Sequence, residues 1–148
     1  MYAYKFDNVY DYIKNEAKHY YALSHRGIKN DDIRNFCNSK GIKVKVRETR
    51  KEMLSKLFET DDYVLEFYET FREYISVSFF DYNERFNVSK EDYDRLKKDD
   101  FFEIECYYKV RSRAYGWIEV PALSAEQFFN MTQEEVDKAL GKGQQALF

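Results

Sequence analysis

Apolar side chains recur with helical spacing at two places in the N-terminal half of the chain. Ile33, Phe36 and Cys37 stand at positions i, i+3 and i+4, and Gly41 follows them where a helix can end. Asn30 is a residue that caps helices, and the two aspartates after it favour a helix N-terminus. The pattern predicts a short helix between Asn30 and Gly41.

A second amphipathic helix is predicted after Thr49. Glu52 follows Thr49 three residues later, which is the spacing of a capping box, and the apolar stripe behind it consists of Met53, Leu54, Leu57 and Phe58. Between the two helices, apolar and basic residues alternate with the period of an extended chain. We therefore expect an extended link whose apolar residues Ile42, Val44 and Val46 are directed inward and whose cations Lys43, Lys45 and Arg47 are directed outward.

Helical periodicity also marks the start of the chain and the segment after residue 60. Residues 1–26 are predicted to form one helix with a frayed start, capped by Asp7 or Asn8, from an apolar face made of Val9, Ile13, Ala17 and Tyr20. A further helix is predicted from Asp61 or Asp62 through Arg72. A strand over Tyr63–Phe67 is left open as an alternative, because aromatic residues favour strands.

The C-terminal half alternates in a way typical of strands. Strands are predicted over residues 74–80 and 85–88, on either side of a turn at 82–84, and over residues 101–110 and 115–120, where Pro121 ends the last one. Ser89 caps a predicted helix between the two strand pairs, Ser124 and Thr132 start further helices, and Gly141 ends the last helix. The predicted fold is α+β: a helical N-terminal half, a small curled antiparallel sheet and a C-terminal helix.

The length of 148 residues suits one domain, or a small module fused to a second one. We expect a helical module over residues 1–60, a small α+β or partial-barrel domain over residues 61–141, and a loose tail over residues 142–148. Cys37 and Cys106 are expected to be free core thiols. Because the sequence shows neither a signal peptide nor an apolar run of membrane-spanning length, we expect a cytoplasmic protein without a membrane partner.

Charge is distributed unevenly along the chain. The net charge is −3, but residues 40–56 contain seven Lys or Arg and two Glu, a local charge of +5, and residues 59–103 carry a local charge of −8. A net negative chain is not coated in cations, so any binding of nucleic acid must be local. Arg50 and Lys51 oppose the dipole of the second helix by about 0.3–1 kcal/mol each, unless an anion binds there. A solvated basic surface that balances the acidic patches is the alternative.

The basic element resembles the SAP motif, a helix–extended–helix DNA-binding module. The first SAP helix is typically Leu-Lys-x-x-Cys-x-x-x-Gly-Leu, and residues 33–42 match that spacing with Cys37 and Gly41. The second is typically Gly-Thr-Lys-x-Glu-Leu-x-x-Arg-Leu, and residues 48–57 match it except that Glu48 replaces the glycine. The link between the helices is also longer than usual. The resemblance implies contact with the backbone of double-stranded DNA, for which the candidate residues are Lys43, Lys45, Arg47, Arg50, Lys51 and Lys56.

Two further surfaces are candidates for binding. Basic and aromatic residues that could stack on bases or contact phosphate gather near the last predicted strand turn, namely Arg111, Arg113, Tyr115 and Trp117. A plain hairpin rim is the alternative there. The acidic segment is also rich in aromatic residues, which anchor protein interfaces, and its candidate protein-binding residues are Asp99, Asp100 and Glu103.

No motif in the sequence indicates catalysis. The chain lacks a P-loop, GxGxxG, GxSxG and zinc-ligand spacing, so we expect no enzyme activity, no cofactor and no metal. We expect a non-enzymatic accessory protein that binds DNA, or a nucleoprotein complex, through the SAP-like element. The rival hypothesis is a small phage or mobile-element inhibitor that binds a host nuclease or CRISPR effector through its acidic aromatic face, mimicking DNA as anti-CRISPR proteins can. The high content of Lys, Asn, Ile, Tyr and Asp in the chain is typical of a protein encoded by an AT-rich genome.

Overall fold

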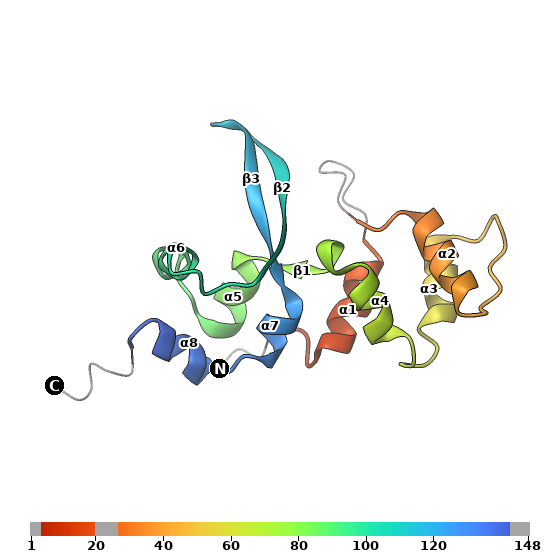
Figure 1. The fold of residues 1–148 in the computed structure, drawn as a ribbon, viewed down its shortest axis with the longest axis horizontal. Helices are drawn as coiled ribbons and strands as arrows, with labels where there is room; N and C mark the ends of the chain where they lie inside the picture. The colour runs from red at the N-terminus through yellow and green to blue at the C-terminus, as the bar shows by residue number, and fades with distance from the viewer. Residues whose placement is uncertain (1–3, 20–26, 143–148) are drawn as a thin grey trace.

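The computed structural model describes residues 4–19 and 27–142. Within these ranges the chain forms eight α-helices, one short 3-10 helix and a three-stranded antiparallel sheet that is not closed (Figure 1). This arrangement confirms the predicted α+β class, with its helical N-terminal half, its small sheet and its C-terminal helices. The elements in chain order are α1 Val9–Ala17, α2 Asn30–Ser39, α3 Arg50–Leu57, α4 Val64–Thr70, η1 Arg72–Tyr74, β1 Ser76–Val77, α5 Phe79–Phe86, α6 Lys90–Lys98, β2 Ile104–Ser112, β3 Gly116–Ser124, α7 Ala125–Asn130 and α8 Gln133–Ala139.

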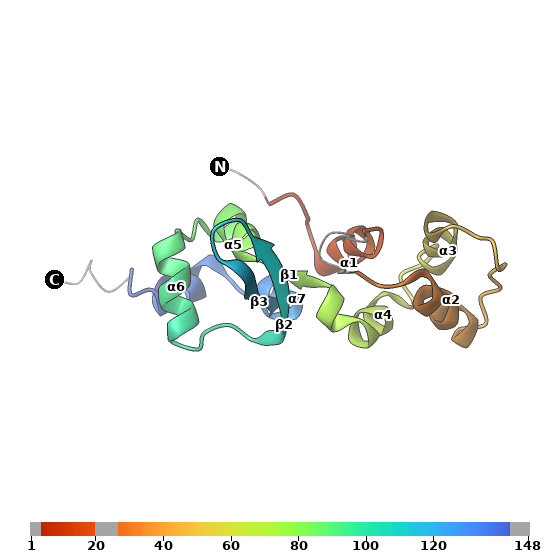
Figure 2. The same cartoon turned by 90° about the horizontal axis from the view of Figure 1, so that it is seen from above.

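The elements are strung out along one long axis. The α2–α3 pair forms one end of the molecule, and α6 and α8 lie towards the other (Figure 1). Seen from above, α1 and α4 lie between the α2–α3 pair and the sheet (Figure 2). None of the helices in the described ranges has the length and apolar composition that a bilayer crossing requires.

The predicted helix starts are confirmed at most positions by side-chain caps. Asn8 caps α1 by accepting a hydrogen bond from the backbone N–H of Asp11, and Thr49 and Glu52 form the predicted capping box of α3. Ser89, Ser124 and Thr132 cap α6, α7 and α8 in the same way. Such caps satisfy N–H groups that have no partner inside the helix. The first predicted helix is shorter than expected, because α1 ends at Ala17, and the part of the prediction that falls on residues 20–26 lies outside the described residues.

Two predictions about helix starts are wrong. The Asn30 side chain does not cap α2, because Asn30 is the first helical residue and its Oδ1 accepts a hydrogen bond from Arg50. Neither Asp61 nor Asp62 is the N-cap of α4, which begins at Val64 after Tyr63. The helix itself is confirmed and the alternative strand over Tyr63–Phe67 is wrong, since Val64, Phe67 and Tyr68 are buried at helical spacing.

The segment from residue 74 to residue 88 departs most from the prediction. Its expected strand is reduced to the two residues of β1, and residues 79–86 form α5 in place of a turn and a returning strand. The physical reason is a capping box: Ser78 N–H donates to Asp81 Oδ2 at 2.9 Å, while the Ser78 side chain accepts from the N3 backbone. Tyr82 and Phe86 then face the core four residues apart. Local helix signals therefore outweigh the strand propensity of the aromatic residues.

The sheet has the order β1–β3–β2, and its longest part is the β2–β3 hairpin. Pro121 does not end β3, as predicted from the sequence, but lies opposite Tyr107 in the middle of the pairing. β1 pairs only with Leu123 and Ser124, so the second edge of β3 is open at Pro121, where a missing N–H is tolerated. The outer part of the hairpin projects from the body as a two-stranded arm (Figure 1).

An aromatic cluster fills the core of the C-terminal half. The ring of Phe128 lies 4.9 Å from that of Tyr82, 5.2 Å from Tyr4 and 5.5 Å from Phe86. The buried residues on both sides of residue 60 belong to one hydrophobic cluster, and α1 contacts both α4 and α7. The division into units at residue 60 stays a prediction, and residues 143–148 of the predicted tail lie outside the described residues.

Candidate nucleic-acid interface

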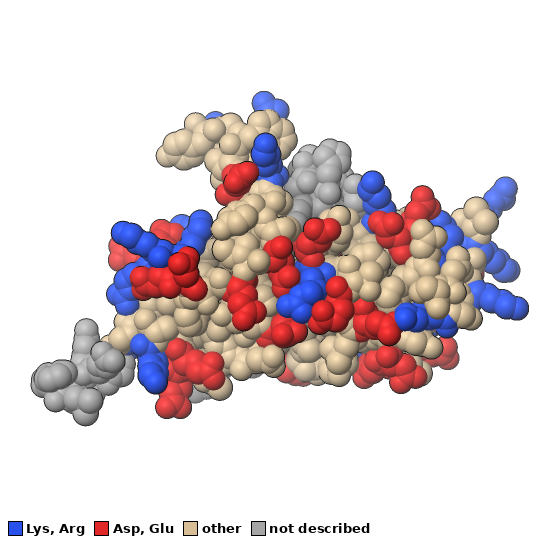
Figure 3. Space-filling model, in the orientation of Figure 1, with Lys and Arg blue, Asp and Glu red and all other residues tan. Residues whose placement is uncertain are grey.

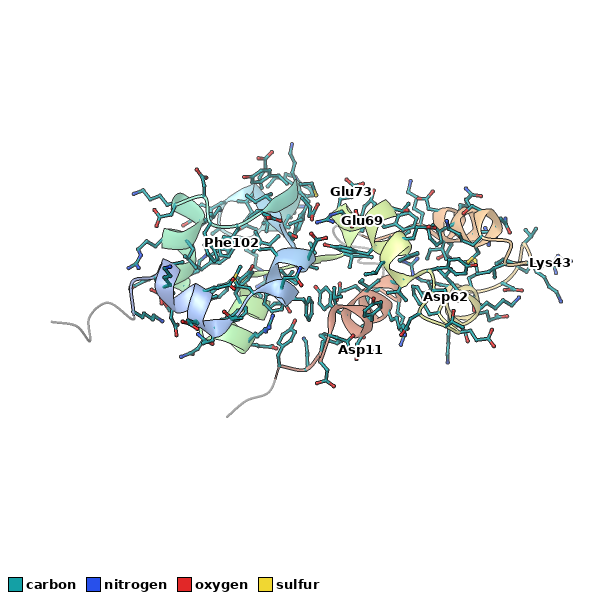
Figure 4. All side chains as sticks on the ribbon, turned by 60° about the horizontal axis from the view of Figure 1, so that its bottom comes forward. Asp11, Lys43, Asp62, Glu69, Glu73 and Phe102 are labelled. Atoms are coloured by element: carbon teal, nitrogen blue, oxygen red, sulfur yellow. The ribbon has the colours of Figure 1, made fainter. Side chains whose placement is uncertain are left out.

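The segment between α2 and α3 is a loop, residues 41–49, which we call the basic loop. It lies at the far end of the molecule, where Lys43 is labelled in Figure 4. Lys43, Lys45 and Arg47 are exposed, as the alternation predicts, and Ile42 and Val44 pack against the core. The prediction for Val46 is wrong, because its side chain is 84% exposed. The chain turns there, with Glu48 N–H donating to Lys45 C=O at 3.1 Å, so the alternation breaks off.

Two cations from the flanking helices hold the backbone of the basic loop. Arg34 of α2 donates from Nη2 to Val46 C=O at 3.1 Å, and its Nη1 pairs with Asp31 at 2.7 Å. Lys56 of α3 donates from Nζ to Lys43 C=O at 3.1 Å and forms an ion pair with Glu48. Lys56, a predicted phosphate contact, therefore already serves the loop itself. Arg34 was missed at the sequence level, since no local pattern links it to Val46.

Glu48 stands where the SAP motif has glycine, and it is an internal residue. Its side chain is only 7% exposed and pairs with Lys56. The hydrogen bond from Lys56 lowers the pKa of the Glu48 carboxyl, so the carboxylate is the favoured form. Burial, and then the charge of Glu48, raise the pKa of the neighbouring Cys37 thiol. Glu48 thus fixes the end of the basic loop against α3.

Arg50 and Lys51 are neighbours in sequence but differ in their surroundings. Arg50 reaches away from α3 to the end of α1, where its Nε donates to Ala17 C=O at 2.8 Å and its Nη2 to His19 C=O at 3.4 Å. Its Nη1 donates to Asn30 Oδ1 at 2.9 Å. Lys51 is exposed. The structure therefore gives Arg50 three internal acceptors and leaves Lys51 directed to solvent.

Four cations at this end of the molecule form no ion pair with a described carboxylate, although the charge of Lys45 contributes to lowering the pKa of the nearby Glu48 carboxyl. Among the described residues, no Asp or Glu lies within ion-pair distance of Lys43, Lys45, Arg47 or Lys51. In Figure 3, Lys and Arg project from the end that carries the basic loop, whereas Asp and Glu crowd the middle. Arg72 in the middle is neutralised by Glu69, Glu105 and Glu126 at 3.0, 2.8 and 3.1 Å.

The second predicted patch lies on the outer part of the β2–β3 hairpin. Arg111 is directly opposite Trp117 in the register, and Arg113 and Tyr115 belong to the turn between the strands. The turn is closed by Ser112 Oγ, which accepts from the N–H groups of Ala114 and Tyr115 at 3.3 Å. The structure brings these four predicted residues together, but on a different element from the basic loop.

The predicted acidic face lies between α6 and β2. Asp99, Asp100 and Glu103 are all exposed, and Asp100 has a left-handed backbone with φ 57°. Asp99 and Asp100 directly follow Lys97 and Lys98, which are exposed in the last turn of α6, and Glu103 lies three residues after Asp100. This surface is therefore of mixed charge.

No cluster of three or more His, Cys, Asp or Glu residues in the described ranges is arranged to hold a metal ion. Comparison of the chain with protein-family models, with curated proteins and with solved structures finds no match.

Proposed function

We propose that this protein is a non-enzymatic, cytoplasmic accessory protein that binds the phosphate backbone of double-stranded DNA through its basic loop. Lys43, Lys45, Arg47 and Lys51 are the phosphate contacts. The observation that carries the proposal is the combination of a loop backbone fixed by internal bonds with outward cations that form no ion pair with a described carboxylate.

Fixing the loop matters because binding costs conformational entropy. A flexible loop would lose that entropy on contact with DNA, whereas this loop is already held by Arg34, Lys56 and Glu48. The N–H groups of Thr49 and Glu52 at the start of α3 are occupied by the capping box. We assign phosphate recognition to the four exposed side chains. Such contacts give affinity and register but carry no sequence information.

The proposal predicts a specific salt dependence. Each neutralised phosphate contributes about −0.9 to the slope of log affinity against log salt, so four contacts give a slope of about −3.6. The test is fluorescence anisotropy of labelled duplexes of two unrelated sequences, titrated between about 50 and 200 mM salt. We expect equal affinity for both sequences.

A pair of matched variants tests the site. Lys43→Gln with Lys45→Gln removes two cations from the basic loop, and Lys97→Gln with Lys98→Gln removes two exposed cations from α6. The first variant should reduce the slope by about 1.8, and the second should leave it unchanged. An equal reduction of the slope in both variants would mean that binding depends on the overall charge of the protein and not on the basic loop. An absence of duplex binding at low salt would refute the proposal and favour the rival inhibitor hypothesis, in which the partner is a protein.

A further inference from the structure

The outer β2–β3 hairpin presents one face that the rest of the described chain does not cover. Strand pairing places Lys109 opposite Glu119 and Arg111 opposite Trp117 on this face, and Tyr107 lies at its inner end, opposite the buried Pro121. Because successive residues of a strand point to opposite sides, Tyr108 and Val110 belong to the other face. That other face borders a cavity of about 430 Å³ between the hairpin, α1 and α5. On the first face Tyr107, Lys109, Arg111, Trp117 and Glu119 are all exposed, whereas Tyr108 and Val110 on the other face are half-buried.

Three large aromatic side chains on this arm are exposed to solvent. Tyr107 is 58% exposed, Trp117 is 63% exposed, and Tyr115 at the turn is 82% exposed. In the described part of the chain, none of the three rings packs against another ring or beneath a cation. Buried area is the main source of stability for apolar groups, so a group of exposed rings on a projecting arm is typical of a binding surface.

The charge of the arm indicates the kind of partner. Residues 107–119 contain three cations, Lys109, Arg111 and Arg113, and one carboxylate, Glu119, in a chain whose net charge is −3. All three cations are exposed. Alternating cations and exposed rings are the combination that binds single strands, since the cations follow the phosphates and the rings stack on bases.

We propose that this face of the hairpin binds single-stranded nucleic acid. Bases stack on Trp117 and Tyr115, and Arg111 and Arg113 contact the flanking phosphates. Unpaired bases expose the flat surfaces that these rings need, whereas bases in a duplex are stacked on one another. This site is separate from the basic loop, uses other residues and takes another form of nucleic acid, so it stands or falls independently of the proposed function.

Trp117 provides its own probe, because it is the only tryptophan in the chain. Titration of the intact protein with a thymine homopolymer should quench its fluorescence, since stacking brings a base against the indole. An abasic oligonucleotide of the same length carries the same phosphates without bases. We expect it to bind at least about tenfold more weakly and to leave the fluorescence unchanged. Equal affinity for both oligonucleotides, or no quenching by the homopolymer, would overturn the inference.

Variants separate stacking from charge and from the basic loop. Trp117→Phe should keep most of the affinity for a labelled homopolymer, and Trp117→Leu should lose about tenfold. Tyr115→Leu in the turn is a second variant, and far-ultraviolet circular dichroism checks that each protein is folded. In the double variant with Lys43→Gln and Lys45→Gln, the homopolymer should quench the Trp117 fluorescence as it does in the wild type. If it does not, or if vesicles of anionic lipid quench Trp117 while the homopolymer does not, the hairpin is not the single-strand site.

Discussion

Replacing Arg50 by Gln tests whether this residue is a structural brace. Arg50 lies in the first turn of α3, where the helix dipole disfavours a cation. Sequence reasoning alone therefore expects its loss to leave stability unchanged or slightly higher. The structure predicts the opposite, because the guanidinium reaches Ala17 C=O, the carbonyl of the last residue of α1, with a hydrogen bond of 2.8 Å. Carbonyls at a helix C-terminus lack partners inside the helix, and a cation there is favourable.

The magnitude follows from the three bonds. The bond to Ala17 is partly buried, and a hydrogen bond to a charged group contributes about 1.5–3 kcal/mol. The bonds to Asn30 and His19 are exposed, so each adds only a few tenths of a kcal/mol. The favourable dipole of α1 and the unfavourable dipole of α3 are of similar size and nearly cancel. The Arg50→Gln variant should therefore lose about 2 kcal/mol, which lowers Tm by about 4–8 °C at this chain length.

The assay is thermal and urea unfolding followed by circular dichroism. Lys51→Gln is the matched control, since Lys51 occupies the same helical turn but is exposed. It should change stability by less than about 0.5 kcal/mol and weaken DNA binding, whereas Arg50→Gln should weaken the fold. Unchanged Tm in Arg50→Gln, or an equal loss in both variants, would show that the bonds to α1 do not brace the fold.

Three further predictions concern the core. Phe128→Ala should cost about 3–5 kcal/mol, measured by urea unfolding, because its ring packs among Tyr4, Tyr82 and Phe86; an effect below about 1 kcal/mol would exclude Phe128 from the core. Burial raises the pKa of several tyrosines in the folded protein above their value of about 10 in the unfolded chain. Their contribution to stability is therefore complete below about pH 10, and it is lost at higher pH because the unfolded chain releases these protons first. Tyrosinate absorbance should rise together with alkaline unfolding, and early ionisation in the native state would contradict this; the tyrosines are Tyr4, Tyr68, Tyr82 and Tyr93. Cys106 is only half-buried and not the core thiol that the sequence predicts, so a thiol reagent should modify it before the fully buried Cys37, and equal rates in the native protein would show that α2 opens readily.

Most of the helix caps were predicted correctly because each cap involves residues that lie close together in the sequence. The caps at Thr49, Ser89 and Ser124 depend on a side chain and an N–H group three residues apart, so their spacing is visible in the sequence. The segment after residue 74 failed because two local signals competed there. Its aromatic residues favour a strand, while Ser78 and Asp81 have the spacing of a capping box, and the structure follows the box.

The candidate site was only partly predictable because its cations differ in their distant partners. Arg50 bonds to Ala17, which is 33 residues away, and Arg34 bonds to Val46 across the basic loop. Neither contact produces a periodic pattern that could be recognised in the sequence. The exposure of Val46 has a similar origin, since the turn that Glu48 and Lys56 stabilise interrupts the alternation before it reaches that residue.

These distant contacts change the number of cations that are available to bind phosphate. Sequence counting gives seven cations in residues 40–56, but the structure pairs Lys40 with Glu66, pairs Lys56 with Glu48 and bonds Arg50 to α1. Four cations remain for phosphate. If charge density alone governed binding, seven contacts would give a salt slope of about −6.3, whereas the geometry predicts about −3.6. The measured slope therefore distinguishes the count of charges in the sequence from the number that the fold leaves free. A value near −6 would mean that DNA breaks the internal pairs and that the loop is not preorganised.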